Sequence, residues 1–389
     1  MRATLAPRSK RPEAIDEGHR PQPVPAASPE PAPLDEREIV TYLIEGGLLD
    51  ARAAVRDRVT VVDQSRRNLN YLVKVDEDGF FVKQGVGRER RSTIGAEATT
   101  HRLLKRSARL DKYMVPLRRF DSARAIEVFD LVPSASSWRD HFVRTRRLPL
   151  MFARRAGRAL AGLHSLSVPP VLPVELRRGP AEILSIHRPP AAILDSTSRA
   201  GLKVAAMVQA AQGLGDALEA AASNWRFEAV IHGDIRWDNC LVFPGSTAHR
   251  ATRLKLIDWE LARVGDPAWD VGCVFAEYLG SWLTSIPSSP DLPPDKALDQ
   301  ATVPLERVQP SLHLFWDFYV KSLDSPRDMT ELLLRATRFA GARLIQSGFE
   351  RADRRAQVST SSVVLIQLGF NMLVRPRAAV THLLGLTDT

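Results

Sequence analysis

The stretch Val230-Ile-His-Gly-Asp-Ile-Arg-Trp-Asp-Asn-Cys-Leu-Val242 decides the fold, because it places polar residues between two short apolar runs. A further apolar run follows and ends in Asp258. Pro244-Gly-Ser246 separates these runs with residues typical of turns, which predicts a hairpin. Such a hairpin would bring Asp234, Asn239 and Asp258 close together.

These three side chains are of the types that phosphoryl transfer requires. One carboxylate must orient the attacking hydroxyl or accept its proton, while a second carboxylate and an amide oxygen must hold Mg²⁺ on the phosphates. Loops at the ends of strands can hold such oxygen ligands rigidly. The sequence therefore predicts Asp234 as the catalytic base, with Asn239 and Asp258 as the metal ligands.

The same stretch is similar to the catalytic loop of the aminoglycoside phosphotransferase and choline kinase superfamily, distant relatives of protein kinases. The family pattern HGD-x4-N matches residues 232–239, and its I-D-W/F pattern matches residues 257–259. The family's GDP-x-x-D matches residues 265–270. The resemblance implies that Asp270 caps a helix and braces the catalytic loop. His232 is expected to support the loop by hydrogen bonding.

Apolar patterns divide the chain into three parts. Residues 1–34 are rich in Pro, Ala, Glu and Arg, which predicts a disordered tail. Residues 35–132 are predicted to form a nucleotide-binding lobe. It is expected to begin with one or two helices over 35–54, with Asp35 as the N-cap, and to contain a further helix at 94–104 and strands at 59–62, 71–75, 80–83 and 125–132. Residues 133–389 are predicted to form the helical catalytic and substrate lobe, with helices near 152–163, 200–223, 268–284, 311–323, 329–348 and 358–374.

The expected fold class is therefore α+β, with a small antiparallel β lobe and a larger, mainly helical lobe. The resemblance implies that the two lobes form a protein-kinase-like fold with ATP and Mg²⁺ bound between them. The residues that it assigns to the nucleotide are the lysine Lys83 on the phosphates, its acidic partner Glu97, Ser65 and Asn68 in the phosphate loop, and backbone groups of Asp130 and Val132 on the adenine. The phosphate loop departs from a glycine-rich loop, since residues 65–71 contain no glycine.

Two further polar residues near the predicted centre have less specific roles. Arg236 lies inside the catalytic loop, where it could neutralise the γ-phosphate or bind an acidic substrate. His164 ends an apolar helical stripe and is expected to be a core histidine rather than a ligand.

Most of the formal net charge of +9 belongs to the folded body, because the first 34 residues carry five basic and four acidic side chains and so contribute only +1. A basic surface favours nucleotides, phosphorylated molecules or acidic peptides as partners. The alternative is that arginine only solvates the surface. No nucleic-acid-binding motif accompanies the charge, so nucleic acid is not an expected partner.

Cysteine usage and hydropathy predict a cytoplasmic protein with no membrane partner. Cys240 and Cys273 lack the spacing of metal ligands and lie in apolar surroundings, as expected of buried thiols in a reducing compartment. No apolar run of about 18 residues is long enough to span a membrane. The N-terminal residues lack the apolar core of a signal peptide.

The acceptor hydroxyl is left open between three classes. Aminoglycosides are polycations, which a basic body disfavours. A small metabolite such as a sugar or an amino alcohol is compatible with the sequence. The preferred class is Ser or Thr of a ribosomally made precursor peptide, because residues 342–346 and 366–386 resemble family members of class V lanthipeptide and thioamitide biosynthesis, where a separate lyase then eliminates phosphate.

A non-catalytic pseudokinase scaffold is the competing class of function. Such proteins normally lose the base, a metal ligand or the lysine. All of these positions are intact in this chain at Asp234, Asn239, Asp258 and Lys83, so an enzyme is expected.

Overall fold

The computed structural model describes residues 32–56, 59–65, 68–76, 78–168, 179–191, 195, 197–244, 253–287, 296, 299–324, 327–355 and 357–387. The chain divides into two units, Met1–Ala32 and Pro33–Thr389. Nearly all of the predicted tail and part of the predicted turn at 244–246 lie outside the described residues.

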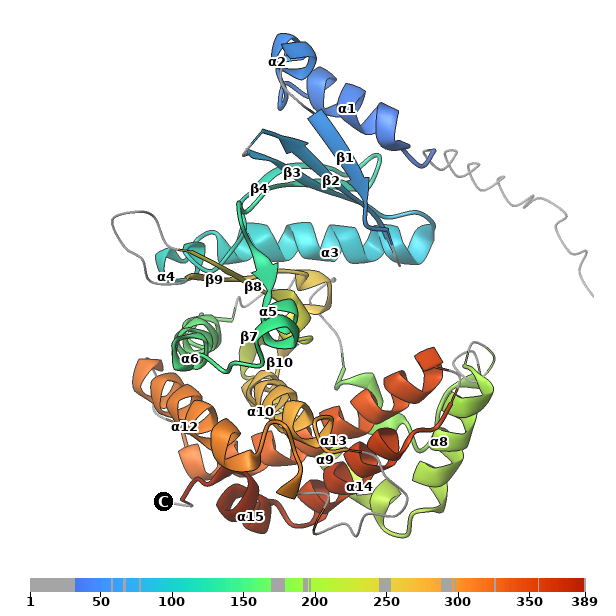
Figure 1. The fold of residues 1–389 in the computed structure, drawn as a ribbon, viewed down its shortest axis with the longest axis vertical. Helices are drawn as coiled ribbons and strands as arrows, with labels where there is room; N and C mark the ends of the chain where they lie inside the picture. Colours follow the sequence, from blue (N-terminus) through green and yellow to red (C-terminus); the bar gives the residue numbers. More distant parts are fainter. Residues whose placement is uncertain are drawn as a thin grey trace, which may run out of the picture. The chain divides into compact units, whose positions relative to one another are not determined.

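The small lobe is built on a five-stranded antiparallel sheet with the strand order β1-β2-β3-β5-β4 (Figure 1). Its strands are β1 (Val59–Asp63), β2 (Leu69–Val75), β3 (Asp78–Gln84), β4 (Leu117–Asp121) and β5 (Ile126–Asp130). The predictions at 59–62, 71–75, 80–83 and 125–132 are confirmed to within a few residues. β4 was missed because it is an edge strand whose middle residues, Arg118 and Arg119, are exposed.

Helices cover both faces of this sheet (Figure 1). The helices in contact with its strands are α1 (Glu36–Glu45) and α3 (Arg88–Leu104), while α2 (Ala51–Arg56) follows α1 and the short α4 (Ala108–Asp111) packs on a helix of the large lobe. The predicted N-cap is confirmed, since the Asp35 side chain accepts from the amides of Arg37 and Glu38 and a capping box forms. Ile39 and Leu43 of α1 are fully buried against strand residues such as Val73.

The large lobe is mainly helical. Its helices are α5 (Trp138–Thr145), α6 (Leu150–His164), η2 (Glu182–Ser185), α8 (Arg199–Ala210), α9 (Leu214–Ser223), α10 (Pro267–Leu283), α12 (Leu305–Ser322), α13 (Met329–Arg355), α14 (Thr360–Val374), α15 (Pro376–Ala379) and η5 (Val380–Leu384). Three predictions needed correction. The helix expected over 311–323 begins at Leu305. The helix expected over 200–223 is two helices, because the chain turns through Gly213 at φ +78°, and α13 continues to Arg355 rather than ending near 348.

Short strands carry the polar stretch that decides the fold. They are β6 (Ser136–Ser137), β7 (Ala229–Ile231), β8 (Cys240–Phe243), β9 (Arg253–Leu256) and β10 (Arg263–Gly265), with the turns η3 (Trp237–Asn239) and η4 (Trp259–Leu261) between them. β8 and β9 pair antiparallel with Cys240 opposite Leu256, which confirms the predicted hairpin. β7 pairs with β10.

Helix α13 is held against its neighbours at glycines that allow close backbone approach. A Cβ atom on Gly369 of α14 would lie 2.4 Å from the carbonyl oxygen of Gly341 on α13. A Cβ atom on Gly272 of α10 would lie 2.6 Å from the carbonyl oxygen of Ala336. These crossings fix the position of α13 and of the two buried arginines that it carries, Arg335 and Arg343.

Among the described residues, no single helix has both the length and the apolar character needed to cross a membrane. The segments Thr360–Val374 and Pro376–Leu384 reach that length and apolar character only when they are taken together, and the chain bends by 116° between them.

Arg335→Met is expected to lower the free energy of unfolding by about 3–5 kcal/mol, because it leaves a buried carboxylate without its counterion. Arg335 bonds both oxygens of the fully buried Asp266, at 3.0 and 3.2 Å. Denaturant unfolding measures the change. The control is Lys321→Met, which breaks the exposed pair with Asp317 and should change stability little. Equal stability of both variants would contradict the expected contribution of Arg335.

Candidate functional site

The polar loop after β7 is shaped by one glycine and one buried carboxylate. Gly233 has φ +83°, and a Cβ atom there would lie 2.4 Å from the carbonyl oxygen of Leu261, so only glycine fits. Asp270, fully buried on α10, accepts from the amides of His232 at 2.7 Å and Gly233 at 3.0 Å. Burial raises the pKa of Asp270, but these bonds and the one to His164 outweigh it and leave the pKa lowered.

One expectation for this region is wrong. Asp270 was expected to cap a helix, but the N-cap of α10 is Asp266, whose side chain accepts from the amide of Ala268 at 2.9 Å. Asp270 lies one turn further on, where its carboxylate faces the loop rather than the end of the helix. The GDP-x-x-D pattern therefore contains two carboxylates with different contacts.

The two histidines near the loop are held by protein contacts. His232 Nε2 lies 3.0 Å from the carbonyl oxygen of Ile257, and its ring packs 4.5 Å from that of Trp259. His164 is buried between the hydroxyl of Tyr319, at 2.9 Å, and the carboxylate of Asp270, at 3.2 Å. His164 is thus a core residue, as predicted.

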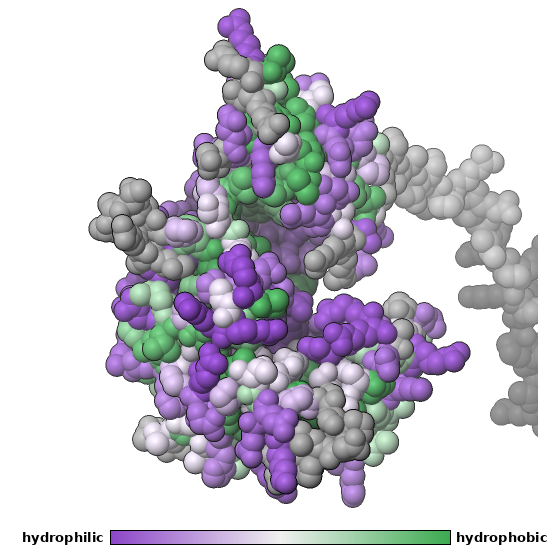
Figure 2. Space-filling view, viewed as in Figure 1, coloured by the Kyte–Doolittle hydropathy of each residue, from purple (hydrophilic) through white to green (hydrophobic). Residues whose placement is uncertain are grey.

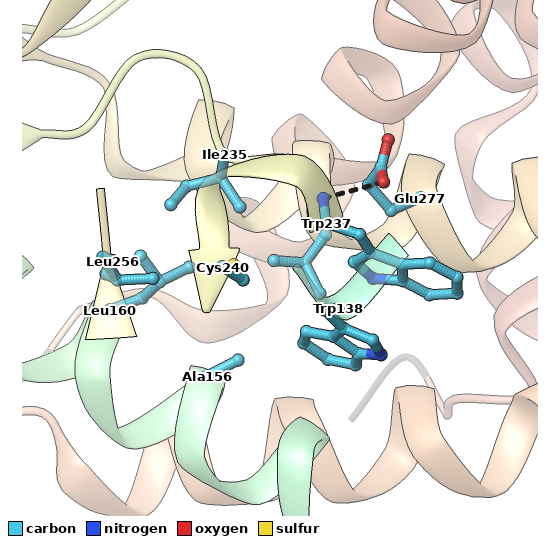
Figure 3. A pocket seen from close by; sticks show the side chains of 9 residues that line it. Trp138, Ala156, Leu160, Ile235, Trp237, Cys240, Leu256 and Glu277 are labelled. Atoms are coloured by element: carbon cyan, nitrogen blue, oxygen red, sulfur yellow. Dashed lines mark hydrogen bonds between the residues drawn. The ribbon is translucent and has the colours of Figure 1, made fainter. Parts of the chain in front are cut away.

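Beneath the loop lies a packed apolar floor. The rings of Trp138 and Trp237 stack with their centroids 5.2 Å apart, and Glu277 accepts from the amide of Trp237 at 2.9 Å (Figure 3). The cavity between these residues, Cys240 and Leu256 has a volume of about 10 Å³, at or below what one water molecule needs. The packed residues around this small cavity support the loop, and the cavity is too small to hold an acceptor substrate.

Asp234 and Asn239 face each other across the loop. The Asn239 side-chain nitrogen donates to the backbone oxygen of Asp234 at 3.0 Å and to its Oδ2 at 3.1 Å. The backbone carbonyl oxygen of Asn239 accepts from the amide of Ile257 at 3.0 Å, which ties the loop to the segment that ends in Asp258. Because its side-chain nitrogen is used, Asn239 has its side-chain oxygen left for another ligand.

Lys83 joins the small lobe to the end of this hairpin. Its ammonium lies 2.7 Å from Glu97 Oε2 on α3 and 2.6 Å from Asp258 Oδ1. The second oxygen of Glu97 accepts from the amide of Trp259 at 3.0 Å. Burial lowers the pKa of Lys83, but Glu97, Asp258 and Glu260 outweigh it and raise the pKa, so the lysine is charged at neutral pH.

Asp258 has an uncommon backbone conformation. Its φ of +66° lies in the left-handed region, which aspartate tolerates better than most residues and which often marks functional sites. Burial raises the pKa of Asp258, but the ammonium of Lys83, with smaller contributions from His232 and Arg236, leaves the pKa lowered. The side chain is 37% exposed and ionised, as a ligand for a cation must be.

The other residues predicted to contact the nucleotide have differing neighbours. Asn68 is buried and donates to Glu260 Oε2 at 3.5 Å, while the Ser65 hydroxyl accepts from the amide of Asn70 at 3.0 Å. Asp130 ends β5, where its amide donates to Pro116 at 3.1 Å, and Val132 follows two residues later. Figure 2 shows a hollow with mainly hydrophilic walls between the small lobe and the helices below it.

The donor set fits a metal that takes most of its ligands from phosphates. No group of three or more His, Cys, Asp or Glu suited to a metal occurs in the part of the chain that the structure describes. Mg²⁺ is usually bound by one or two protein oxygens together with substrate phosphates and water. Asn239 and Asp258 supply two such oxygens. Lys83 Nζ lies 2.7 Å from Glu97, 2.6 Å from Asp258 and 3.7 Å from Glu260, so the predicted metal ligand Asp258 is adjacent to the predicted phosphate-binding lysine.

The sequence analysis assigned no role to four charged residues that the structure places at or beside the site. Arg343 Nη2 lies 3.2 Å from Asp234 Oδ1, and Glu350 accepts from Arg236 at 3.3 Å. Arg236 itself lies 3.9 Å from Asp234 Oδ2. The missed residues are Arg343 and Glu350 of α13, Glu260 after the I-D-W match, and Glu277 of α10. A single arginine among the apolar residues 340–345 was the signal that could have identified Arg343.

A buried carboxyl group lies beside the lysine. Glu127 is directly opposite Lys83 in the β3–β5 register, is fully buried, and neither of its side-chain oxygens accepts a hydrogen bond from a described residue. Burial, followed by the charge of Glu97, raises the pKa of Glu127 well above its ordinary value of 4.5, although Lys83 lowers it. Glu127 therefore holds its proton to higher pH than an exposed carboxyl group.

This raised pKa predicts a pH-dependent stability. The folded state keeps a proton that the unfolded chain releases near the ordinary pKa, so stability falls as the pH rises between the ordinary and the raised pKa. Glu127→Gln cannot lose that proton. The melting temperature of Glu127→Gln should fall less than that of the unchanged chain between pH 5 and pH 8. Glu45→Gln changes an exposed side chain of α1, and its melting temperature should follow that of the unchanged chain. Identical pH dependence of all three proteins would contradict the buried protonated state.

Comparison with known proteins places this geometry in a family. Residues 58–301 match the sequence profile of the phosphotransferase enzyme family, while no curated protein sequence gives a significant match. Plasmodium vivax ethanolamine kinase is 14% identical with a TM-score of 0.51, over 87% of this chain and 88% of its own. That likeness supports the kinase-like fold and confirms the predicted α+β class.

Two other solved structures are similar at lower scores. A spectinomycin phosphotransferase solved with ADP and spectinomycin is 11% identical with a TM-score of 0.49, over 88% of this chain and 99% of its own. Choline kinase from Cryptosporidium parvum is 11% identical with a TM-score of 0.49, over 89% and 96%. Because the profile matches more than half of the 389 residues, the chain belongs to the phosphotransferase enzyme family.

Proposed function

We propose that this enzyme transfers the γ-phosphoryl group of Mg²⁺-bound ATP to a hydroxyl group at Asp234. The observation that carries the proposal is the contact of Lys83 with both Glu97 and Asp258, at 2.7 and 2.6 Å, beside the Asp234–Asn239 pair. An ammonium, an acceptor-only carboxylate and a free amide oxygen are the groups that hold phosphates and a divalent cation.

Each residue has one task in this mechanism. Lys83, held by Glu97, binds the α- and β-phosphates, while Asn239 and Asp258 hold Mg²⁺. When bound, the metal neutralises charge on the phosphates. The carbonyl of Asp130 and the amide of Val132 bind adenine, since the amide of Asp130 already donates to Pro116. The remaining assignments are Ser65 and Asn68 to the phosphate loop, and His232 and Asp270 to support of the catalytic loop.

Transfer then proceeds by in-line displacement. The acceptor oxygen attacks the γ-phosphorus, and the bond from that phosphorus to the bridging oxygen of ADP breaks. Asp234 orients the hydroxyl and accepts its proton. Arg236, 3.9 Å from Asp234 Oδ2 and partly exposed, supplies positive charge to the transferred phosphoryl oxygens.

For the acceptor we propose Ser or Thr of a ribosomally made precursor peptide, with a separate lyase that eliminates the phosphate. Arg236 and Arg343 place two guanidinium groups at Asp234, and the net charge is +9. Both features disfavour a polycation such as an aminoglycoside and favour a neutral or acidic chain. Both cysteines are free and buried, as suits the reducing cytoplasm that we propose for the enzyme.

The acceptor class is tested with γ-labelled ATP, Ser/Thr peptides encoded beside the gene, and a panel of sugars, amino alcohols and aminoglycosides. A peptide should gain about 80 Da per phosphoryl group by intact mass, and Asp234→Ala should abolish the gain. Label on a small molecule alone would replace the peptide by a metabolite or drug as acceptor. Label on neither would refute transfer to these acceptor classes.

The metal assignment is tested by Asp258→Asn, which keeps the shape of the side chain and removes its charge. Turnover should fall on the order of 100-fold or more, and Mg²⁺ should no longer tighten ATP binding in calorimetry. Asp317→Asn, an exposed change on α12, is the matched control and should leave both quantities unchanged. Full Mg²⁺-dependent activity of Asp258→Asn would exclude Asp258 as a metal ligand.

A further inference from the structure

Two side chains hold the carboxylate of Asp234 from opposite sides. Arg343 Nη2 lies 3.2 Å from Oδ1, and the Asn239 side-chain nitrogen lies 3.1 Å from Oδ2. Rotation of the carboxylate would weaken both contacts, so together they define its plane. Asn239 belongs to the same loop as Asp234, whereas Arg343 reaches it from α13, which lies far along the chain.

We infer that Arg343 is a positioning residue for catalysis, which locks the Asp234 carboxylate in the orientation that receives the acceptor hydroxyl. The inference rests on the proposed function of Asp234. It adds to the active site a residue beyond the matched range 58–301 and outside the HGD-x4-N loop.

A contribution to the stability of the fold does not by itself explain why an arginine is buried at position 343. The residue is 2% exposed and its Nε has no hydrogen-bond partner among the described residues. Burying a guanidinium with an unpaired N–H is costly. Its partners Asp234 and Glu350 have side chains 20% and 24% exposed, so water can solvate them if the arginine is removed.

Arg335 on the same helix provides the opposite case. It is also buried, but its partner Asp266 is fully buried and bonded through both oxygens. Removing Arg335 strands a buried charge, whereas removing Arg343 leaves two carboxylates that water reaches. Removing Arg335 should therefore lower stability more than turnover. Removing Arg343 should lower turnover more than stability.

The charge of Arg343 is permanent in this environment. Burial lowers its pKa, but the attraction of Asp234 and, more weakly, of Glu350 outweighs it and leaves the pKa raised. A permanently charged donor with a planar fork holds a carboxylate more firmly than a lysine, which is a mobile point charge. Lysine at this position should restore the position of the carboxylate only in part.

The test compares Arg343→Met, Arg343→Lys and Arg335→Met in the full chain, with the acceptor identified as above. Arg343→Met should lower kcat on the order of 100-fold, with KM for ATP changed less than about threefold and the melting temperature kept within a few degrees. Arg343→Lys should fall between Arg343→Met and the unchanged chain. Arg335→Met should instead lose melting temperature and keep kcat at temperatures where it is folded.

A double-mutant cycle shows whether Arg343 acts through Asp234. Labelled ATP makes the slow turnover of Asp234→Asn measurable, and in that background Arg343→Met should change kcat less than about threefold. A full additional loss would overturn the positioning role, as would wild-type kcat in Arg343→Met. If Arg343→Met does not fold, Arg343→Lys takes its place in the comparison, and retention of full kcat by that variant would overturn the inference.

Failure of the proposed function and failure of the inference about Arg343 give different results. If the unchanged chain transfers no phosphoryl group to any acceptor, the proposed function fails and the inference fails with it. If the unchanged chain is active and the Arg343 variants are equally active, the inference alone fails.

Discussion

The contact of one buried ammonium with two carboxylates is the interaction on which the rest of the site depends. Lys83 belongs to the sheet of the small lobe, Glu97 to α3, and Asp258 to the end of the β8–β9 hairpin in the large lobe. A buried cation must be neutralised where it lies, so the three elements are held together at this point. The same contact places an ionised Asp258 next to the group that would bind phosphates.

The loop and the hairpin that carry Asp234, Asn239 and Asp258 could be predicted because they are local in sequence. Residues 232–239 and 257–259 supply the loop and the hairpin within about 30 residues, and turn chemistry and apolar runs identify both. Edge strand β4 lacked a pattern, since Arg118 and Arg119 are exposed in its centre.

What could not be predicted depends on contacts between distant segments. Arg343 meets Asp234 across 109 positions of sequence, and helical periodicity cannot say which loop a buried arginine will face. The helix cap was assigned to Asp270 because the family resemblance implied it, but α10 begins one turn earlier and Asp266 is its N-cap. The proton on Glu127 likewise depends on the register of β3 with β5, which the sequence of either strand does not encode.

The close crossing of α13 and α14 gives the helical lobe a mechanical part in the chemistry. Gly341 lies two residues before Arg343, and the backbone of Gly369 touches it, so the spacing of two helices sets how far a guanidinium reaches toward the catalytic loop. The acceptor side of the enzyme can therefore be retuned by residues that touch neither substrate nor nucleotide. A sequence change where α13 crosses α14 would alter the orientation of the Asp234 carboxylate through Arg343. Enzymes with the same phosphoryl-transfer chemistry could in this way adapt to acceptors of different shape.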